Sequence, residues 1–261
     1  MQYGIPSLME FTKVESHAAF AAENGFAFIE LNMTYPWFGT DALDRAALRA
    51  AAEKAGIGYT LHLHDQVNPL EFCPELRQGS LDVIRKAVSL AAGLHAPRIT
   101  MHLLPGMYSS VNGTKVYLNR RCIDRYLELT EAFGREIAAL LNGTETVFCI
   151  ENTTGYGSYH HEAIELLLGF PCFGLTYDIG HDAKTGFADQ AFILRHSDRL
   201  RHFHIHDCSA SSNHLALGEG TLDIEKYISL ASSLEASILL EVKESSALLK
   251  SKETLERLGL W

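Results

Sequence analysis

Three histidines alternate with apolar residues in the stretch 201–207, which reads Arg-His-Phe-His-Ile-His-Asp. Neighbouring side chains of a strand point to opposite faces, so His202, His204 and His206 are expected to share one face. A buried imidazole needs a polar partner, because an unpaired polar group is costly in an apolar interior. A metal ion at the end of the strand would supply one. Alternatively, individual histidines are core groups, and His202, the deepest, is the best candidate for that role.

The sequence around this stretch predicts alternating strands and helices. Apolar runs predict strands at residues 3–6, 26–31, 58–64, 98–102, 146–152, 172–178, 200–206 and 238–242. Periodic or alanine-rich segments predict helices at residues 14–24, 42–55, 74–94, 116–141, 161–168, 188–196, 224–234 and 246–258. Eight strand–helix units in 261 residues are typical of the (β/α)8 TIM barrel, an α/β fold with a buried parallel sheet. Because no linker divides the chain, residues 1–261 are expected to form a single domain.

Ionisable residues close six consecutive predicted strands, where apolar residues would be the ordinary expectation. In this fold functional residues lie at the carboxyl ends of the strands, so these groups should meet at one rim. They are His62, His64, Asp65, His102, Glu151, Asp178, His181, His204, His206 and Glu241. Mixed carboxylate and imidazole ligands suit Zn²⁺, Mn²⁺ or Co²⁺ better than Mg²⁺ or Ca²⁺ alone. The sequence therefore predicts a divalent-metal site at this rim.

Composition narrows the class of protein and its expected surroundings. A formal charge of −10 and a pI near 5.7 argue against a general nucleic-acid-binding surface, although a local groove can be positive on an acidic protein. Five cysteines form no CxxC pair, so we expect reduced thiols in a cytoplasmic protein. No leader sequence is visible, and no apolar run is long enough to span a bilayer. We therefore expect a cytoplasmic location without membrane attachment.

The chain resembles the xylose-isomerase-like TIM-barrel superfamily, which also contains the endonuclease IV family of DNA-repair enzymes (AP endonuclease family 2). The resemblance lies in five segments that follow the superfamily's order: residues 150–157, 178–181, 204–207 and 214–220, and finally Glu241. Sugar isomerases and epimerases of this superfamily hold one divalent ion with two glutamates, an aspartate and a histidine. The resemblance implies that the ligands of this metal ion, Mn²⁺ or Zn²⁺ or else Co²⁺, are Glu151, Asp178, His204 and Glu241.

The same resemblance implies proton transfer on a small hydroxy-carbonyl substrate such as a sugar. Glu151 and Glu241 would be the catalytic pair, one removing a proton beside a carbonyl and the other returning it to the neighbouring carbon or the opposite face. The metal ion would stabilise the enediolate between these steps. His181 would bind a substrate oxygen or orient a ligand. The residues expected to contact the substrate are His64, His102, His181, His206, His214 and Trp37.

The endonuclease IV family offers an alternative, an apurinic/apyrimidinic endonuclease with a cluster of three zinc ions. Glu151 would then bridge the first and second sites. The additional metal ligands in a multinuclear site would be His64, His102, His181 and His214. The family's third site also uses an aspartate shortly before its last histidine, and this chain has Ser212 there. The resemblance therefore does not supply every ligand of a trinuclear centre.

Loop composition favours the sugar enzyme over the nuclease. A DNA-binding surface needs several Lys or Arg contacts with phosphates, yet the predicted loops 32–40, 65–75, 152–161 and 208–222 contain none. Aromatic side chains such as Trp37 could instead stack on a sugar. The preferred hypothesis is a metal-dependent isomerase or epimerase that binds a small sugar or polyol. A proton-abstracting lyase and a non-catalytic metal- or sugar-binding barrel stay open, as does pairing into a homodimer.

Overall fold

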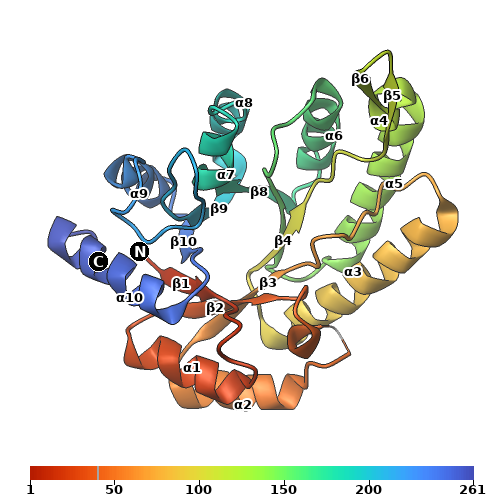
Figure 1. Ribbon diagram of the computed structural model, residues 1–261. Helices are drawn as coiled ribbons and strands as arrows, with labels where there is room; N and C mark the ends of the chain where they lie inside the picture. Colours follow the sequence, from red (N-terminus) through yellow and green to blue (C-terminus); the bar gives the residue numbers. More distant parts are fainter. Residues whose placement is uncertain (40) are drawn as a thin grey trace.

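The computed structural model describes residues 1–39 and 41–261, and its main sheet closes on itself as a barrel (Figure 1). The strands are parallel and follow the order β1-β10-β9-β8-β7-β4-β3-β2 around it. They are β1 (Tyr3–Pro6), β2 (Phe28–Asn32), β3 (Gly58–His62), β4 (Arg98–His102), β7 (Val147–Glu151), β8 (Phe173–Asp178), β9 (Leu200–Ile205) and β10 (Ser237–Leu240). The predicted α/β TIM barrel is confirmed.

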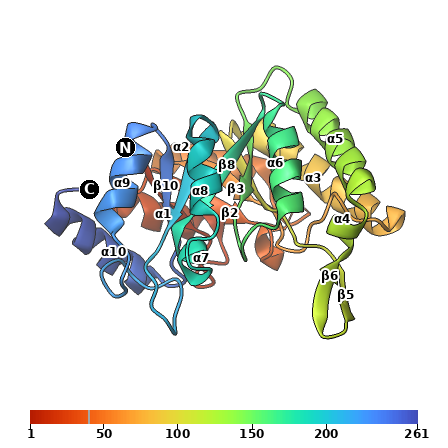
Figure 2. The ribbon, with the colours of Figure 1, turned by 90° about the horizontal axis from the view of Figure 1, so that it is seen from above.

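Helices follow the strands and cover the outside of the barrel (Figures 1 and 2). They are α1 (Val14–Glu23), α2 (Arg45–Ala55), α3 (Pro74–Leu94), α4 (Leu118–Arg121), α5 (Ile123–Leu140), α6 (Ser158–Leu168), α7 (Ile179–Lys184), α8 (Gln190–Arg195), α9 (Ile224–Ser233) and α10 (Ser245–Leu258). Local signals set their ends. The carboxylate of Asp44 accepts hydrogen bonds from the first turn of α2, and Gly56 ends that helix with a φ of 70°.

The core lies between the helices and the outer face of the sheet, and polar side chains occupy part of the barrel's interior. Every residue of β8 is buried. The hydroxyls of Thr100 and Thr176, both fully buried, lie 3.1 Å apart inside the barrel. Buried polar groups of this kind need partners, and here they find them in one another. The interior can therefore also hold the charged groups described below.

A β-hairpin stands outside the barrel. β5 (Tyr108–Val111) pairs antiparallel with β6 (Thr114–Tyr117) through the turn Asn112–Gly113, whose φ angles are 50° and 77°. Two positive φ values in a two-residue loop are typical of a type I′ hairpin. The predicted helix at 116–141 is therefore wrong at its start, because Val116 belongs to β6 and the helical segment is divided into α4 and α5. Figure 2 shows the hairpin projecting from the barrel on the same side as α7.

Several predicted boundaries shift at the carboxyl ends of the strands. The predicted strands 58–64, 146–152, 200–206 and 238–242 end at His62, Glu151, Ile205 and Leu240. Helix α7 was not predicted. It begins directly after β8 because the carboxylate of Asp178 accepts the backbone N–H of His181 and caps it. No helix among the described residues is long and apolar enough to cross a membrane.

Candidate metal centre

The four side chains predicted as metal ligands meet at one end of the barrel. Glu151 and Asp178 are the last residues of β7 and β8. His204 lies near the end of β9, and Glu241 follows β10 directly. Because these four strands are neighbours in the closed sheet, one donor atom from each residue lies within 4.8 Å of the others. His204 Nδ1 lies 3.0 Å from Glu151 Oε1 and 3.0 Å from Glu241 Oε2.

Burial and charge act against each other at these residues. Burial alone would lower the pKa of His204, but the carboxylates of Glu151 and Glu30 raise it well above its usual 6.5. Burial would raise the pKa of Glu151, but His204 and His102 hold it well below 4.5. Each group is thus charged at neutral pH only because opposite charges surround it.

Glu241 is the most accessible of the four. Its side chain is 15% exposed, against 1% for Glu151. Glu241 Oε1 lies 2.8 Å from Lys243 Nζ and 3.4 Å from His214 Nε2. Burial would raise the pKa of Glu241, but Lys243 and His204 hold it well below 4.5. Lys243 was not among the predicted site residues. The sequence signal that could have identified it is its position, two residues after Glu241.

Two histidines contact the other face of Glu151. His62 Nε2 lies 3.0 Å and His102 Nε2 3.3 Å from Glu151 Oε2. His64, which was predicted for this position, is exposed, and its Nδ1 accepts the backbone N–H of Gln66. The structure thus places His62, and not His64, beside Glu151, because β3 ends at His62 and the alternation of an extended strand does not continue to His64.

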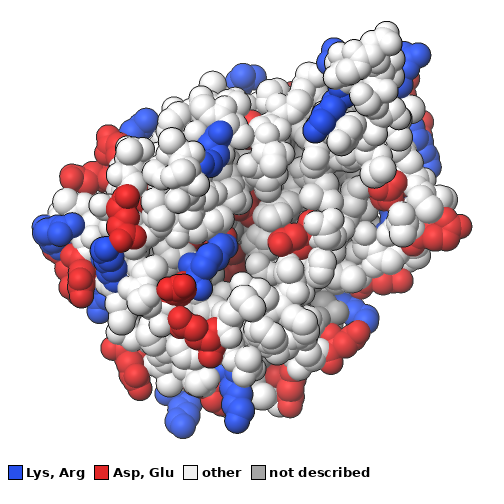
Figure 3. Space-filling view, viewed as in Figure 1, with Lys and Arg blue, Asp and Glu red and all other residues white. Residues whose placement is uncertain are grey.

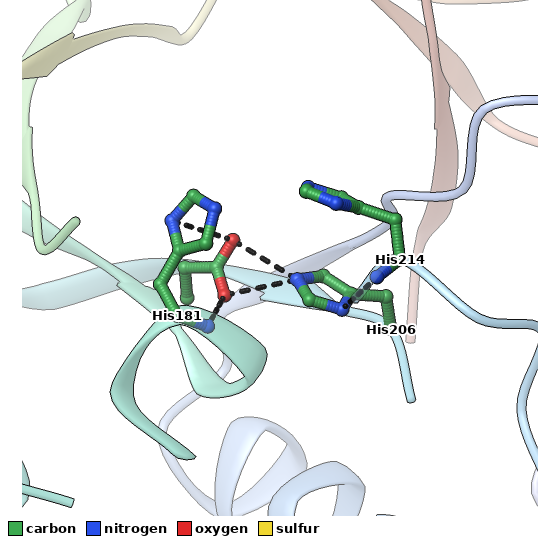
Figure 4. A group of neighbouring side chains, drawn as sticks. His181, His206 and His214 are labelled. Atoms are coloured by element: carbon green, nitrogen blue, oxygen red, sulfur yellow. Dashed lines mark hydrogen bonds and ion pairs between the residues drawn. The ribbon is translucent and has the colours of Figure 1, made fainter. Parts of the chain in front are cut away.

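His181, His206 and His214 gather around Asp178 (Figure 4). His206 Nε2 lies 3.1 and 3.3 Å from the two carboxylate oxygens of Asp178, and His181 Nδ1 lies 3.3 Å from Oδ2. The His214 ring stacks on His206 with centroids 4.3 Å apart, and its backbone N–H donates to His206 Nδ1. One donor atom of each residue lies within 4.8 Å of the others. This group therefore shares Asp178 with the first.

The loop after β9 is held in place by Asp207. Its carboxylate is 1% exposed and accepts backbone N–H groups of Cys208, Gly218, Gly220 and Leu222. The Asp207 backbone also pairs with that of Leu215. These bonds fix the backbone next to His214, whose φ of 53° is rarely adopted by residues other than glycine. Asp207 therefore positions the loop that carries His214.

Sequence reasoning missed Glu30 of β2, a carboxylate inside the barrel that is 2% exposed. It lies within ion-pair distance of His202 and His204. His202, expected to be structural, is fully buried, and its Nδ1 lies 2.6 Å from Ser237 Oγ. An acid inside an apolar strand was the available signal for Glu30. Because Glu30 does not end its strand, the pattern of ionisable residues at strand ends does not include it.

Trp37 is partly buried in the 3₁₀ turn Pro36–Phe38 after β2. Its ring stacks on Tyr35 with centroids 5.5 Å apart. Trp37 Nε1 is buried without a hydrogen-bond partner in the described part of the chain. The structure does not bring Trp37 into the groups around the carboxylates, and a contact with substrate stays a prediction.

The four-residue group fits a divalent cation. Three carboxylates and one imidazole meet at a largely buried point, where like charges are destabilising unless a cation neutralises them. Glu241 Oε2 is also a buried oxygen without a hydrogen bond to the described residues. This donor set suits Mn²⁺, Zn²⁺ or Co²⁺. The fold and the site together define a TIM-barrel protein with a candidate divalent-metal centre at its carboxyl-terminal rim.

The chain belongs to the xylose isomerase-like TIM barrel family, whose sequence model matches residues 18–258. Among solved structures, a D-tagatose 3-epimerase-like protein has 20% identity and a TM-score of 0.79, with 98% of this chain and 96% of that one covered. The 3-keto-D-glucoside 4-epimerase of E. coli has 16% identity and a TM-score of 0.78, with both chains fully covered. An IolI protein with a binding zinc atom has 11% identity and a TM-score of 0.74, with 98% and 97% covered. These likenesses establish the fold, and no curated protein matches the chain.

Proposed function

We propose that this protein is a divalent-metal-dependent isomerase or epimerase acting on a small hydroxy-carbonyl compound such as a sugar. The observation that carries the proposal is the meeting of Glu151, Asp178, His204 and Glu241 at one point of the rim. Solved structures with the same fold include a D-tagatose 3-epimerase-like protein and a D-allulose 3-epimerase in complex with D-allulose, which supports the reaction class.

The two glutamates are a pair of carboxylates that could transfer protons at one point of the rim. Glu151 and Glu241 each approach His204 Nδ1 at 3.0 Å, and both are ionised at neutral pH. Glu241, the more accessible, would take the proton from the carbon beside the carbonyl, and Glu151 would act at the other side. A bound metal ion would supply Lewis-acid stabilisation of developing negative charge. His181 and His214, at the edge of the site, would bind substrate hydroxyls.

Solvent exchange tests this assignment. With an accepted ketose in D2O, the wild-type protein should incorporate deuterium at the carbon beside the carbonyl. Glu241→Gln should lower that rate by at least ~100-fold, since general acid–base groups contribute about 10²–10⁴. Glu253→Gln, which changes an exposed glutamate of α10, is the matched control and should exchange at the wild-type rate. Exchange retained in Glu241→Gln would show that this carboxylate is not the base.

A second candidate is an apurinic/apyrimidinic endonuclease with a zinc cluster. The observation in its favour is that further groups of ligand type flank the first, His62 with Asp65 and His102 on one side and the histidines around Asp178 on the other. Against it, Lys and Arg side chains are scattered among Asp and Glu on the face seen in Figure 3 and form no continuous track. Phosphate contacts dominate binding to DNA, so this distribution favours the sugar enzyme.

Metal analysis and one oligonucleotide separate the two candidates. Elemental analysis of the purified protein should find about one divalent ion per chain if it is a single-metal isomerase. Close to three zinc ions, together with incision of a duplex that contains an abasic site, would establish the nuclease instead. A protein that binds sugars tightly yet neither exchanges nor converts any of a broad panel would be a binding module. Loss of water from the substrate would identify a lyase.

A further inference from the structure

We propose that Glu30 is a positioning residue that fixes the orientation and protonation of His204, so that Nδ1 of this imidazole faces the metal centre. The inference rests on the metal site of the proposed function. Glu30 belongs to β2, which lies across the barrel from the strands that carry the candidate ligands. Glu30 would act through His204 and would not touch the metal ion or the substrate.

The two nitrogens of His204 face different carboxylates. Nδ1 lies 3.0 Å from oxygens of Glu151 and Glu241, at the metal centre. Nε2 lies 3.1 Å from Glu30 Oε1, deeper inside the barrel. A nitrogen and a carboxylate oxygen at this distance require a proton between them, because two lone pairs would repel each other, so both nitrogens of His204 carry a proton when no metal ion is bound. A metal ion held by the four candidate ligands would take the place of the proton on Nδ1, whereas Glu30 would keep the proton on Nε2.

Glu30 is itself held by several groups. The Thr60 hydroxyl donates to Glu30 Oε2 at 3.0 Å, and His202 Nε2 lies 3.3 Å from the same oxygen. Both imidazoles lie within ion-pair distance of Glu30 but without the alignment of a good hydrogen bond. The attraction is therefore mainly that of a buried negative charge for imidazole N–H groups. Such a charge makes the far nitrogen of His204 a stronger electron donor.

The contacts on the two oxygens of Glu30 separate two roles. Oε2 contacts Thr60 and His202, which are buried and are not among the four candidate ligands. Oε1 serves His204. If the carboxylate of Glu30 were purely structural, it would matter only for folding. Loss of its contact with Thr60 and loss of its contact with His204 would then have the same kind of effect. A positioning carboxylate would affect metal affinity only when the contact with His204 changes.

Metal affinity measured without substrate tests the proposal. Glu30→Gln keeps the size of the side chain but removes its charge, and should weaken binding of Zn²⁺ or Mn²⁺ by about 10–100-fold in competition with a chelating dye. Thr60→Val is the matched control, because it removes a buried hydrogen bond to the same carboxylate and leaves the contact with His204. The metal affinity of Thr60→Val should stay within about threefold of wild type, although its melting temperature should fall because a buried hydrogen bond is lost. Equal losses of affinity in the two variants, or no loss in Glu30→Gln, would overturn the proposal.

A spectroscopic measurement complements the titration. In the zinc-loaded wild-type protein, ¹⁵N NMR of the imidazoles should show His204 protonated at Nε2 and bound through Nδ1. Protonation at Nδ1 would overturn the proposal even if Glu30→Gln fails to fold. In that event Glu30→Asp, which keeps the charge but shortens its reach, should lose affinity where Thr60→Val does not. None of these measurements uses catalysis, so an inactive protein with the predicted affinities would contradict the isomerase and leave the role of Glu30 intact.

Discussion

His62 and His64 are two positions apart and have opposite surroundings. His62 is buried against Glu151. Burial would lower the pKa of His62, but the carboxylates of Glu151 and Glu30 outweigh this effect and raise it to about 9. His64 is exposed to solvent. We predict that His62→Gln weakens binding of a divalent ion by at least ~10-fold, because it removes an orienting partner of a ligand carboxylate. The titration that checks this is the chelator competition described above.

His64→Gln is the control for this change. Since its ring lies outside the group around Glu151, its metal affinity and its turnover should stay within about twofold of wild type. If His64→Gln weakened binding and His62→Gln did not, the strand-end assignment made from the sequence would be restored.

Residue types at strand ends predicted more of the site than their exact positions did. Glu151, Asp178, His204 and Glu241 were identified from resemblance and strand order, and the structure brings them together. The prediction named His64 for the place beside Glu151 that His62 occupies, because the point where β3 stops extending is set by tertiary pairing. Glu30 is invisible to the same argument, since its importance comes from a contact with His204 across the barrel.

Among the elements, the β5–β6 hairpin depends on one glycine. Gly113 has a φ of 77°, which side chains with a Cβ rarely adopt, and we predict that Gly113→Ala destabilises the hairpin by about 1 kcal/mol. Hydrogen exchange should then be faster at residues 108–117 and unchanged in the barrel strands. Exchange that stayed slow there would mean that contacts beyond the turn hold the hairpin.

Gly79→Ala should have the opposite effect on stability. Gly79 lies inside α3, is exposed, and has open space where a Cβ would be. The same substitution should therefore stabilise the protein by about 0.5–1 kcal/mol in urea unfolding.

The pattern of strands and helices predicted the barrel, because each element has a strong apolar signal and parallel strands with helical crossovers close in few ways. The hairpin was missed although Asn112–Gly113 is a strong turn signal, since the strands Tyr108–Val111 and Thr114–Tyr117 are short and mostly exposed and so lack an apolar strand pattern. Helix α7 was missed because Ile179–Lys184 is too short for helical periodicity. Its start depends on the cap made by Asp178.

Over the whole molecule, buried neutral histidines make stability depend on pH. Burial lowers the pKa of His17, His160 and His202 to about 4, from 6.5 in an unfolded chain. As the pH falls below 6.5 the unfolded state binds protons that the folded state does not bind until about pH 4. These groups therefore favour the folded state above pH 6.5 and progressively less as the pH falls toward 4.

His17 offers the cleanest test, because it lies far in sequence from the candidate ligands and packs on Phe11 with ring centroids 4.9 Å apart. His17→Leu should lower the dependence of unfolding free energy on pH near pH 5 by up to about 1.4 kcal/mol per pH unit. Urea unfolding of the metal-free protein at several pH values measures this slope. An unaltered slope in His17→Leu would mean that His17 is protonated in the folded protein.

Three of the four candidate ligands belong to strands, whereas Glu241 lies just beyond Leu240, where β10 has ended. The sheet holds three donors rigidly, and the fourth is on a connection that leads into α10 and is shared with Lys243. We expect an ion to enter and leave past Glu241, so that substitutions at positions 243 and 244 change the rate of metal exchange more than the equilibrium affinity. The same connection is the place where the spacing between the two glutamates can be adjusted by design, provided that the buried Val242 stays in the core.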